Sequence, residues 1–246
     1  MGVFNYMNSL FLMPAISLLI VSAASFTNSA MSEIIVIDNF NKELEVPGLL
    51  VNYYVANAHQ ASQNIGTIRG NAVTREVDLT RVYNSDPTAF FSSKSSVVND
   101  IFAWSNDPGT ASNTTLNYQF GPTNILSPAG SQHGSVILDI LNVDLDAIAT
   151  ITLVDSNDQS ATFSQTISTP GAQQLGFSYD DFLAVNSNLD LTQVKSVSTF
   201  LSQQTGATAV DFEMDILVFN TPEPSSVMLF SLAGIGFASR RRRKRN

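Results

Sequence analysis

Carboxylates dominate the side chains of this chain that could do chemistry. Its 246 residues hold 21 Asp and Glu, 2 His and no Cys. Because cysteine is absent and His59 and His133 show no metal-binding H-x-x-x-H or H-E-x-x-H spacing, a zinc site is not expected. The chain also lacks a P-loop and a dinucleotide-binding glycine fingerprint, and residues 176–180 fail the G-x-S-x-G pattern at the last position. No catalytic residue is therefore assigned, and we do not expect an enzyme.

Paired carboxylates nevertheless keep one enzymatic alternative open. Glycoside hydrolysis needs two acids about 5 to 9.5 Å apart in space. With this many acids such pairs arise by chance in any fold, so the sequence selects none of them. An exported polysaccharide-active enzyme, a hydrolase or a lyase, is thus the alternative. We expect His133 in a loop and Trp104 in the core.

The charge distribution excludes one class of partner. The whole chain carries a net charge of −9, but six of its 12 basic residues stand in residues 240–245, which leaves −15 on residues 1–239. Such a surface repels phosphate backbones, so no nucleic acid is expected as a partner. Without cysteine, the body depends on its core or on bound ions for stability.

The end of the chain combines a turn, an apolar run and a cationic cluster. Pro222, Glu223 and Pro224 cannot lie inside a helix, because proline fixes φ and lacks an N–H donor. The apolar residues 227–238 follow. The chain then closes on the basic residues Arg240, Arg241, Arg242, Arg243, Lys244 and Arg245. Each cation would cost about 3 kcal/mol at the bilayer centre, so the sequence predicts a transmembrane segment at 225–239 and a cytoplasmic tail at 240–246. This segment is short, because a spanning helix needs about 20 residues.

These three pieces together resemble the PEP-CTERM sorting signal of Gram-negative bacteria. In that family an integral membrane protease-transpeptidase, the exosortase, recognises and processes the signal. The carriers are exported proteins, often associated with exopolysaccharide. The resemblance implies that exosortase is a partner of this chain, that residues 221–246 are the sorting signal, and that the protein is anchored transiently in the inner membrane before it reaches the envelope or the exterior.

The start of the chain agrees with export. Residues 10–21 are mostly apolar, and small residues follow up to Ala24 and Ala30. This arrangement is typical of a secretory signal peptide, although no Lys or Arg precedes Lys42. We predict a signal peptide at 1–30, cleaved after Ala24 or Ala30, and a mature body at 31–220.

The body predicts strands throughout. Val73, Val77 and Leu79 alternate with polar residues, and so do residues 116–120, 136–140 and 151–153. Val210, Phe212, Met214, Ile216 and Val218 are expected to form one core-facing side of the last strand. Residues 84–115 are rich in Ser, Asn and Asp and are expected to form long loops; residues 180–185 are the one short helix candidate. The pattern predicts an all-β fold, a single antiparallel β-sandwich.

A second, weaker resemblance concerns this body. The opening Asp38 and Phe40, residues 173–182 and 189–197, and the closing Asp211–Ile216 segment follow an order similar to that of galactose-binding-like jelly rolls, the fold of many carbohydrate-binding modules. The resemblance implies a jelly-roll sandwich. In those folds the first and last strands can share a Ca²⁺, which implies Asp38, Asp211 and Asp215 as ligands of a structural Ca²⁺; no other cofactor is expected. The alternative is that Asp211 and Asp215 only form the polar side of an alternating strand.

Taken together, the residues favour an exported, non-enzymatic envelope or matrix protein. It would be sorted by exosortase and associated with exopolysaccharide.

Overall fold

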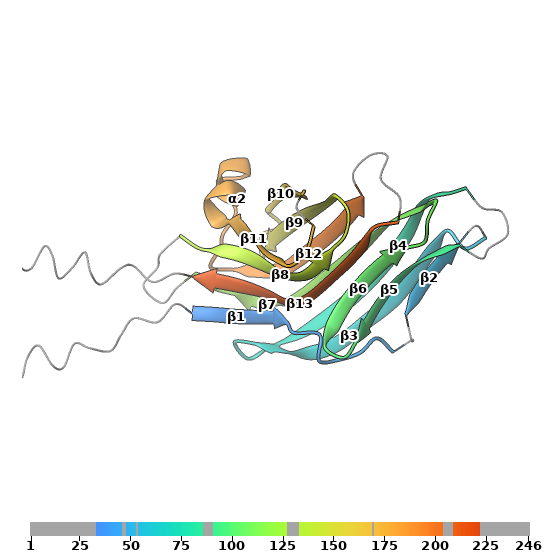
Figure 1. Ribbon diagram of the computed structural model, residues 1–246. Helices are drawn as coiled ribbons and strands as arrows, with labels where there is room; N and C mark the ends of the chain where they lie inside the picture. Colours follow the sequence, from blue (N-terminus) through green and yellow to red (C-terminus); the bar gives the residue numbers. More distant parts are fainter. Residues whose placement is uncertain are drawn as a thin grey trace, which may run out of the picture. The chain divides into compact units, whose positions relative to one another are not determined.

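The computed structural model describes residues 33–221, apart from 46–47, 53, 86–90, 127–132, 169 and 204–208. In this part of the chain almost all regular structure is strand, and one short helix interrupts it (Figure 1). In chain order the elements are β1 (Glu33–Asp38), β2 (Leu49–Asn52), β3 (Asn57–Ile68), β4 (Asn71–Asn84), β5 (Ser92–Val98), β6 (Ile101–Asn106), β7 (Thr110–Thr123), β8 (Ser135–Val143), β9 (Ala147–Asp155), β10 (Ser160–Ile167), β11 (Gln173–Ser178), α2 (Tyr179–Val185), β12 (Val194–Gln203) and β13 (Asp211–Thr221). The predicted all-β class is confirmed. The signal peptide predicted at 1–30 and the transmembrane segment predicted at 225–239 lie outside the described residues.

The strands form two antiparallel sheets. The seven-stranded sheet has the order β11-β8-β13-β6-β5-β2, with β1 paired to β13. The six-stranded sheet has the order β10-β9-β12-β7-β4-β3. Their inner sides share one core, in which the rings of Phe120 on β7 and Phe219 on β13 meet edge-to-face with centroids 6.4 Å apart. The predicted antiparallel β-sandwich is therefore confirmed.

Alternation along each strand decides which side chains enter this core. On β9 every second residue is buried, including Ile151 and Leu153, and on β4 the same holds for Val77 and Leu79. Successive side chains of a strand point to opposite sides, so one side of each strand packs and the other meets solvent. Each fully buried aliphatic side chain contributes about 1.5–3 kcal/mol. The apolar-polar alternation is thus what assembles the two sheets.

The last strand breaks its own alternation. Phe212 and Met214 are buried as predicted, but Ile216 is only half-buried, and Leu217 and Phe219 occupy the core positions beyond it. The register of β13 against β8 shifts between Glu213 and Met214 and again between Met214 and Ile216. A bulge inserts an unpaired residue and exchanges the two sides of the strand. The prediction that Ile216 faces the core was wrong for this reason.

The polar stretch at 84–115 is also different from the prediction. Instead of long loops, most of it forms β5, β6 and the start of β7. Its polar side chains satisfy one another inside the sandwich: Trp104 Nε1 donates to Ser112 Oγ at 2.9 Å, and Ser112 Oγ donates to Asn106 Oδ1 at 2.6 Å. Trp104 is fully buried, as predicted. Buried polar groups are tolerated when they are hydrogen-bonded to each other. The prediction of long loops, which rested on the polar composition of residues 84–115, was therefore wrong.

The turn between β9 and β10 is built around a buried carboxylate. Asp155 accepts hydrogen bonds from the backbone N–H groups of Asn157, Gln159 and Asp190 at 2.8, 3.0 and 2.9 Å. Burial opposes ionisation of Asp155, but these bonds, with the one from Asp190 foremost, outweigh it and lower the pKa of the carboxyl. Asp155 therefore ties this hairpin to the segment that leads into β12.

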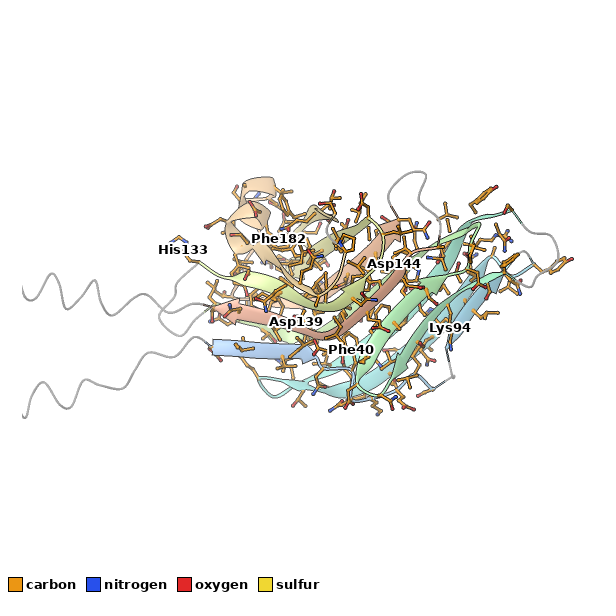
Figure 2. All side chains as sticks on the ribbon, viewed as in Figure 1. Phe40, Lys94, His133, Asp139, Asp144 and Phe182 are labelled. Carbon is orange, nitrogen blue, oxygen red and sulfur yellow. The ribbon has the colours of Figure 1, made fainter. Side chains whose placement is uncertain are left out.

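The short helix predicted at 180–185 is present as α2. Ser178 caps it, because its Oγ accepts from the Asp180 N–H at 3.2 Å. Tyr179 and Phe182, three residues apart, form its buried side. The ring of Phe182, which Figure 2 labels, meets that of Phe163 on β10. In the described part of the chain, no helix has the length and hydropathy needed to cross a bilayer.

Candidate functional site

The outward side of the six-stranded sheet is a continuous array of small polar side chains, which we call the polar face. It arises because the inward positions of the same strands are taken by the apolar core. Two neighbouring rows cross it, the first from β10 to β3 and the second from β10 to β4. The first row consists of Ser164, Thr150, Phe200, Thr115, Asp78 and His59, and the second of Thr162, Thr152, Ser198, Asn117 and Glu76.

Hydrogen bonds link neighbours within and between these rows. Thr152 Oγ1 and Thr162 Oγ1 are 2.9 Å apart, and Ser198 Oγ donates to Asn117 Oδ1 at 2.8 Å. Asn117 Nδ2 in turn donates to Asp78 Oδ2 at 3.4 Å. These contacts hold side chains from five strands in fixed orientations, so the face is preorganised.

The edge of the polar face carries a histidine–carboxylate pair. His59 Nδ1 lies 2.7 Å from Asp78 Oδ1, and both side chains are largely exposed, at 55% and 41%. The pair has no neighbouring serine or cysteine hydroxyl or thiol hydrogen-bonded to His59 among the described residues, so it does not form a nucleophilic triad. Its geometry orients the imidazole for hydrogen bonding at the surface.

The chemistry of the polar face is hydrogen-bond donation and acceptance. Hydroxyl and amide groups do both, and strands about 4.8 Å apart present them at a regular spacing. Phe200, half-buried in the middle of the first row, is the one Phe, Tyr or Trp side chain of the two rows. Glu76 and Asp78 make the local charge negative, and neither row contains a Lys or Arg. Such a surface suits an uncharged polyhydroxylated ligand.

Asp38, the first predicted calcium ligand, is instead paired with a buried cation. Its Oδ2 accepts from Arg75 Nη1 at 2.7 Å, and its Oδ1 accepts from the Phe40 N–H at 2.8 Å. Arg75 also donates to the Lys42 carbonyl at 2.5 Å and to Gln63 Oε1 at 3.3 Å. Its guanidinium lies 5.8 Å from the centroid of the Phe40 ring. Both carboxylate oxygens of Asp38 are thereby used within the protein.

The other two predicted ligands, Asp211 and Asp215, lie on β13. Partial desolvation raises the pKa of Asp211, and the carboxylates of Asp144, Asp107 and Glu213 raise it further. Asp211 N–H also donates to Asp144 Oδ1 at 2.7 Å.

Asp215 has its own carboxylate neighbour. Desolvation raises its pKa, and Asp139, which Figure 2 labels, adds to the effect. In the register of β1 on β13, Asp38 faces Leu217. Among the described residues no group of three or more His, Cys, Asp or Glu side chains is placed to hold a metal ion, so the structure does not bring Asp38, Asp211 and Asp215 together.

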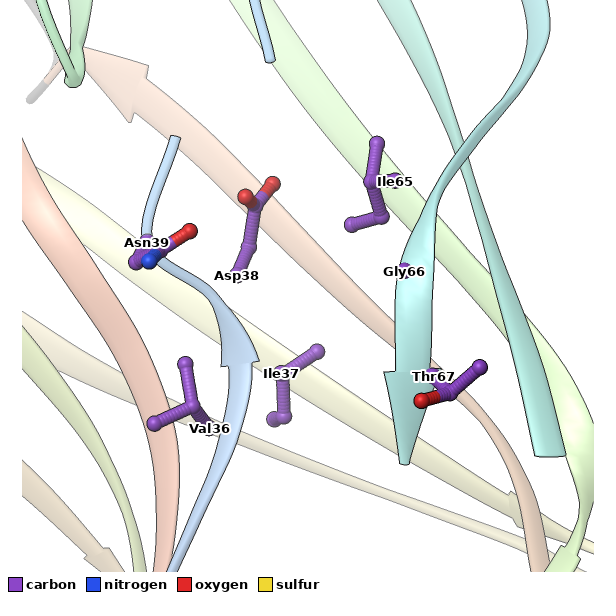
Figure 3. A pocket seen from close by; sticks show the side chains of 7 residues that line it. All are labelled: Val36, Ile37, Asp38, Asn39, Ile65, Gly66 and Thr67. Atoms are coloured by element: carbon purple, nitrogen blue, oxygen red, sulfur yellow. The ribbon is translucent and has the colours of Figure 1, made fainter. Parts of the chain in front are cut away.

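A small cavity opens beside Asp38. It has a volume of about 160 Å³ and lies between β1 and β3, lined by Val36, Ile37, Asp38, Asn39, Ile65, Gly66 and Thr67 (Figure 3). Gly66 adopts a φ of 149°, a conformation that favours glycine, at a register shift of β3 against β4. Because Arg75 neutralises the single carboxylate in its wall, the cavity presents no free charge.

The sequence analysis predicted neither the polar face nor the buried ion pair of Arg75 with Asp38. Ser and Thr at alternating positions of β9, β10 and β12 were the available signal, but register alone decides which of them become neighbours. His133, expected in a loop, does lie outside the strands, with a side chain 82% exposed and 3.4 Å from Asp180. The sorting residues Pro222, Glu223 and Pro224 and the basic residues 240–245 lie outside the described residues.

Comparison with known families places the PEP-CTERM protein-sorting motif at residues 220–243. No curated protein matches the chain.

Among solved structures, the family 11 carbohydrate-binding module of a Clostridium thermocellum cellulase is 10% identical, with a TM-score of 0.37 over 80% of this chain and 99% of that one. The family 30 module of another cellulase from that organism is also 10% identical, with a TM-score of 0.38 over 76% and 96%. An agarase, AgWH50C, is 9% identical with a TM-score of 0.39 over 59% of this chain, which spans only 25% of the agarase. These likenesses are weak.

Proposed function

We propose that this protein is an exported, non-enzymatic component of the cell envelope or extracellular matrix. Residues 1–30 direct export, the β-sandwich at 31–220 is the functional body, and residues 221–246 are the sorting signal. The observation that carries the proposal is the sorting motif at 220–243, which begins in the last two residues of the final strand of the sandwich.

Exosortase processes the signal in this scheme. Residues 225–239 hold the chain briefly in the inner membrane while the basic residues 240–245 stay on the cytoplasmic side. Replacing Pro222, Glu223 and Pro224 by Ala leaves export intact and keeps the protein membrane-bound at full mature length. Mass spectrometry of the native C-terminus in its own host tests this. A mature protein that still carries residues 240–245 would show that the tail is only an anchor.

The body associates with exopolysaccharide through the polar face. Its hydroxyl and amide groups hydrogen-bond sugar hydroxyls, and Phe200 offers an apolar contact. Because the face carries Glu76 and Asp78 and the body is strongly acidic, anionic polysaccharides are repelled and neutral or amino-substituted ones are favoured.

Affinity electrophoresis of the secreted protein in gels containing a neutral β-glucan, chitosan or alginate tests this. We expect retardation by at least one of the first two and none by alginate. Asn117→Ala and Phe200→Ala should each weaken binding by about tenfold, or about 1.4 kcal/mol. Asn142→Ala, at an exposed position of β8 in the other sheet, is the matched control and should leave binding unchanged. Retardation by alginate alone, or equal binding by Asn117→Ala and Asn142→Ala, contradicts the assignment.

A polysaccharide-active enzyme is the second candidate. The observation in its favour is the interaction of Asp139 with Asp215: partial burial raises the pKa of Asp215, and the carboxylate of Asp139 raises it further. Such a pair can provide one protonated and one ionised acid. This candidate requires release of reducing sugar or of unsaturated ends from a polysaccharide by the purified protein, and loss of that release in Asp215→Asn.

A further inference from the structure

The two ends of the folded body are paired with each other. In the described part of the chain β1 pairs only with β13, and Glu33 stands opposite Thr221 while Ile34 stands opposite Asn220. Thr221 Oγ1 donates to the Glu33 carbonyl at 3.2 Å, across 188 positions of sequence. Figure 1 shows the blue β1 and the orange-red β13 side by side.

The sorting motif overlaps this pair. Its match begins at residue 220, whereas β13 ends at Thr221, so Asn220 and Thr221 belong to both. Thr221 is fully buried. Asn220 is paired on both sides, with Ile34 of β1 and Ser135 of β8. Pro222 is the next residue in the chain, so no spacer separates the sheet from Pro222, Glu223 and Pro224.

This overlap limits how an enzyme can hold the motif. A protein that binds an extended segment does so largely through backbone hydrogen bonds. Asn220 and Thr221 are already held in the ladder with β1, whose antiparallel pairing uses the backbone groups of every second residue, and Thr221 Oγ1 adds a hydrogen bond to the Glu33 carbonyl. An enzyme therefore reaches the chain before Pro222 only after these residues separate from Ile34 and Glu33.

We propose that β1 is a latch over the N-terminal border of the sorting motif, and that processing requires Asn220 and Thr221 to leave β1. This rests on the proposed processing by exosortase. During export β1 emerges first and the end of β13 last, so the latch can close only when the whole body has left the membrane. Processing is fast before closure and slow after it, and the pairing of β1 thus sets how long the body stays tethered.

Because the chain has no cysteine, a disulfide can lock the latch without competing partners. Ile34→Cys combined with Asn220→Cys places two thiols on facing residues. Facing residues of antiparallel strands have Cα atoms about 4.5–5.5 Å apart, which suits a disulfide. The matched control is Asn220→Cys alone, which carries the same change in the motif but no crosslink. A further variant adds Gly-Ser-Gly-Ser between Thr221 and Pro222 of the locked chain.

Pulse–chase labelling in the native host measures the rate at which the tail is lost. We expect the locked chain to be processed about tenfold more slowly than the single-cysteine control, equivalent to about 1.4 kcal/mol of added opening free energy. The spacer should restore the control rate, because it frees the motif while the latch stays closed. Equal rates for the locked and single-cysteine chains overturn the latch, and so does a locked chain that the spacer fails to rescue. A wild-type chain that keeps its tail instead refutes the processing itself.

Discussion

Replacing Asp38 by Asn should destabilise the sandwich far more than a single surface charge would. The change removes the carboxylate that neutralises Arg75 but keeps an oxygen that can accept from the Phe40 N–H. The side chains of Arg75 and Asp38 are 0% and 2% exposed, so water cannot replace the lost partner. Removing one partner of a buried ion pair leaves an uncompensated charge and costs about 3–5 kcal/mol.

Two further variants separate the contribution of the buried charge to stability from that of the hydrogen bond. Asp38→Ala removes the Phe40 bond as well and should cost about 1 kcal/mol more than Asp38→Asn. Arg75→Met combined with Asp38→Asn should recover most of the loss, because no charge is then buried. Lys195 and Asp158 form the matched exposed pair, with side chains 34% and 86% exposed. Breaking that pair by Lys195→Met should cost less than about 1 kcal/mol.

Urea denaturation followed by tryptophan fluorescence measures these differences, since Trp104 is buried and is the only Trp of the chain. The midpoints convert to free energies of unfolding if the slope of the transition stays constant. If Asp38→Asn shifts the free energy by no more than Lys195→Met does, or if the double variant is less stable than Asp38→Asn, the reasoning on the buried pair is refuted.

Three further predictions concern buried polar and acidic groups. Ser112→Ala should cost about 1–3 kcal/mol in urea denaturation, because it leaves Trp104 Nε1 and Asn106 Oδ1 buried without their partner; a neutral result would show that these groups find other partners. The lowered pKa of Asp155 means that its contribution to stability is present above its unfolded pKa and is lost as pH falls through the folded one. Asp155→Asn should therefore flatten the acid side of a plot of melting temperature against pH, and an unchanged slope counts against this. The pKa of Asp215 is raised, so its ionised carboxylate destabilises the folded state at neutral pH. Asp215→Asn should therefore raise the melting temperature at neutral pH and lose that advantage in acid; a lower melting temperature at pH 7 speaks against it.

Local patterns were enough to predict much of this protein. The alternation around Val77, Leu79, Ile151 and Leu153 predicts strands because side-chain direction depends only on position along the strand. The α2 helix was predicted from residues 180–185 for a similarly local reason, and its Ser178 cap lies next to it in sequence. The sorting motif at 220–243 is local too, since its order of turn, apolar run and cations is contained in one short segment.

Pairings between distant residues were not readable from the sequence. Arg75 stands at an inward position of its strand, and only the approach of β1 brings Asp38 to neutralise it. The bulge in β13 exchanges the sides of the strand between Met214 and Leu217, which an unbroken alternation does not predict.

The polar face and the latch also depend on contacts between residues that are far apart in the sequence. Asn117 meets Ser198 and Asp78 through the registers of three separate strands, and Glu33 meets Thr221 across the whole body. The sequence by itself determined which residues face inward wherever a strand keeps its alternation, and which signal the end of the chain carries, because both are properties of neighbouring residues. Only the tertiary structure decided which distant side chains meet, because strand order and register follow from the packing of all strands at once.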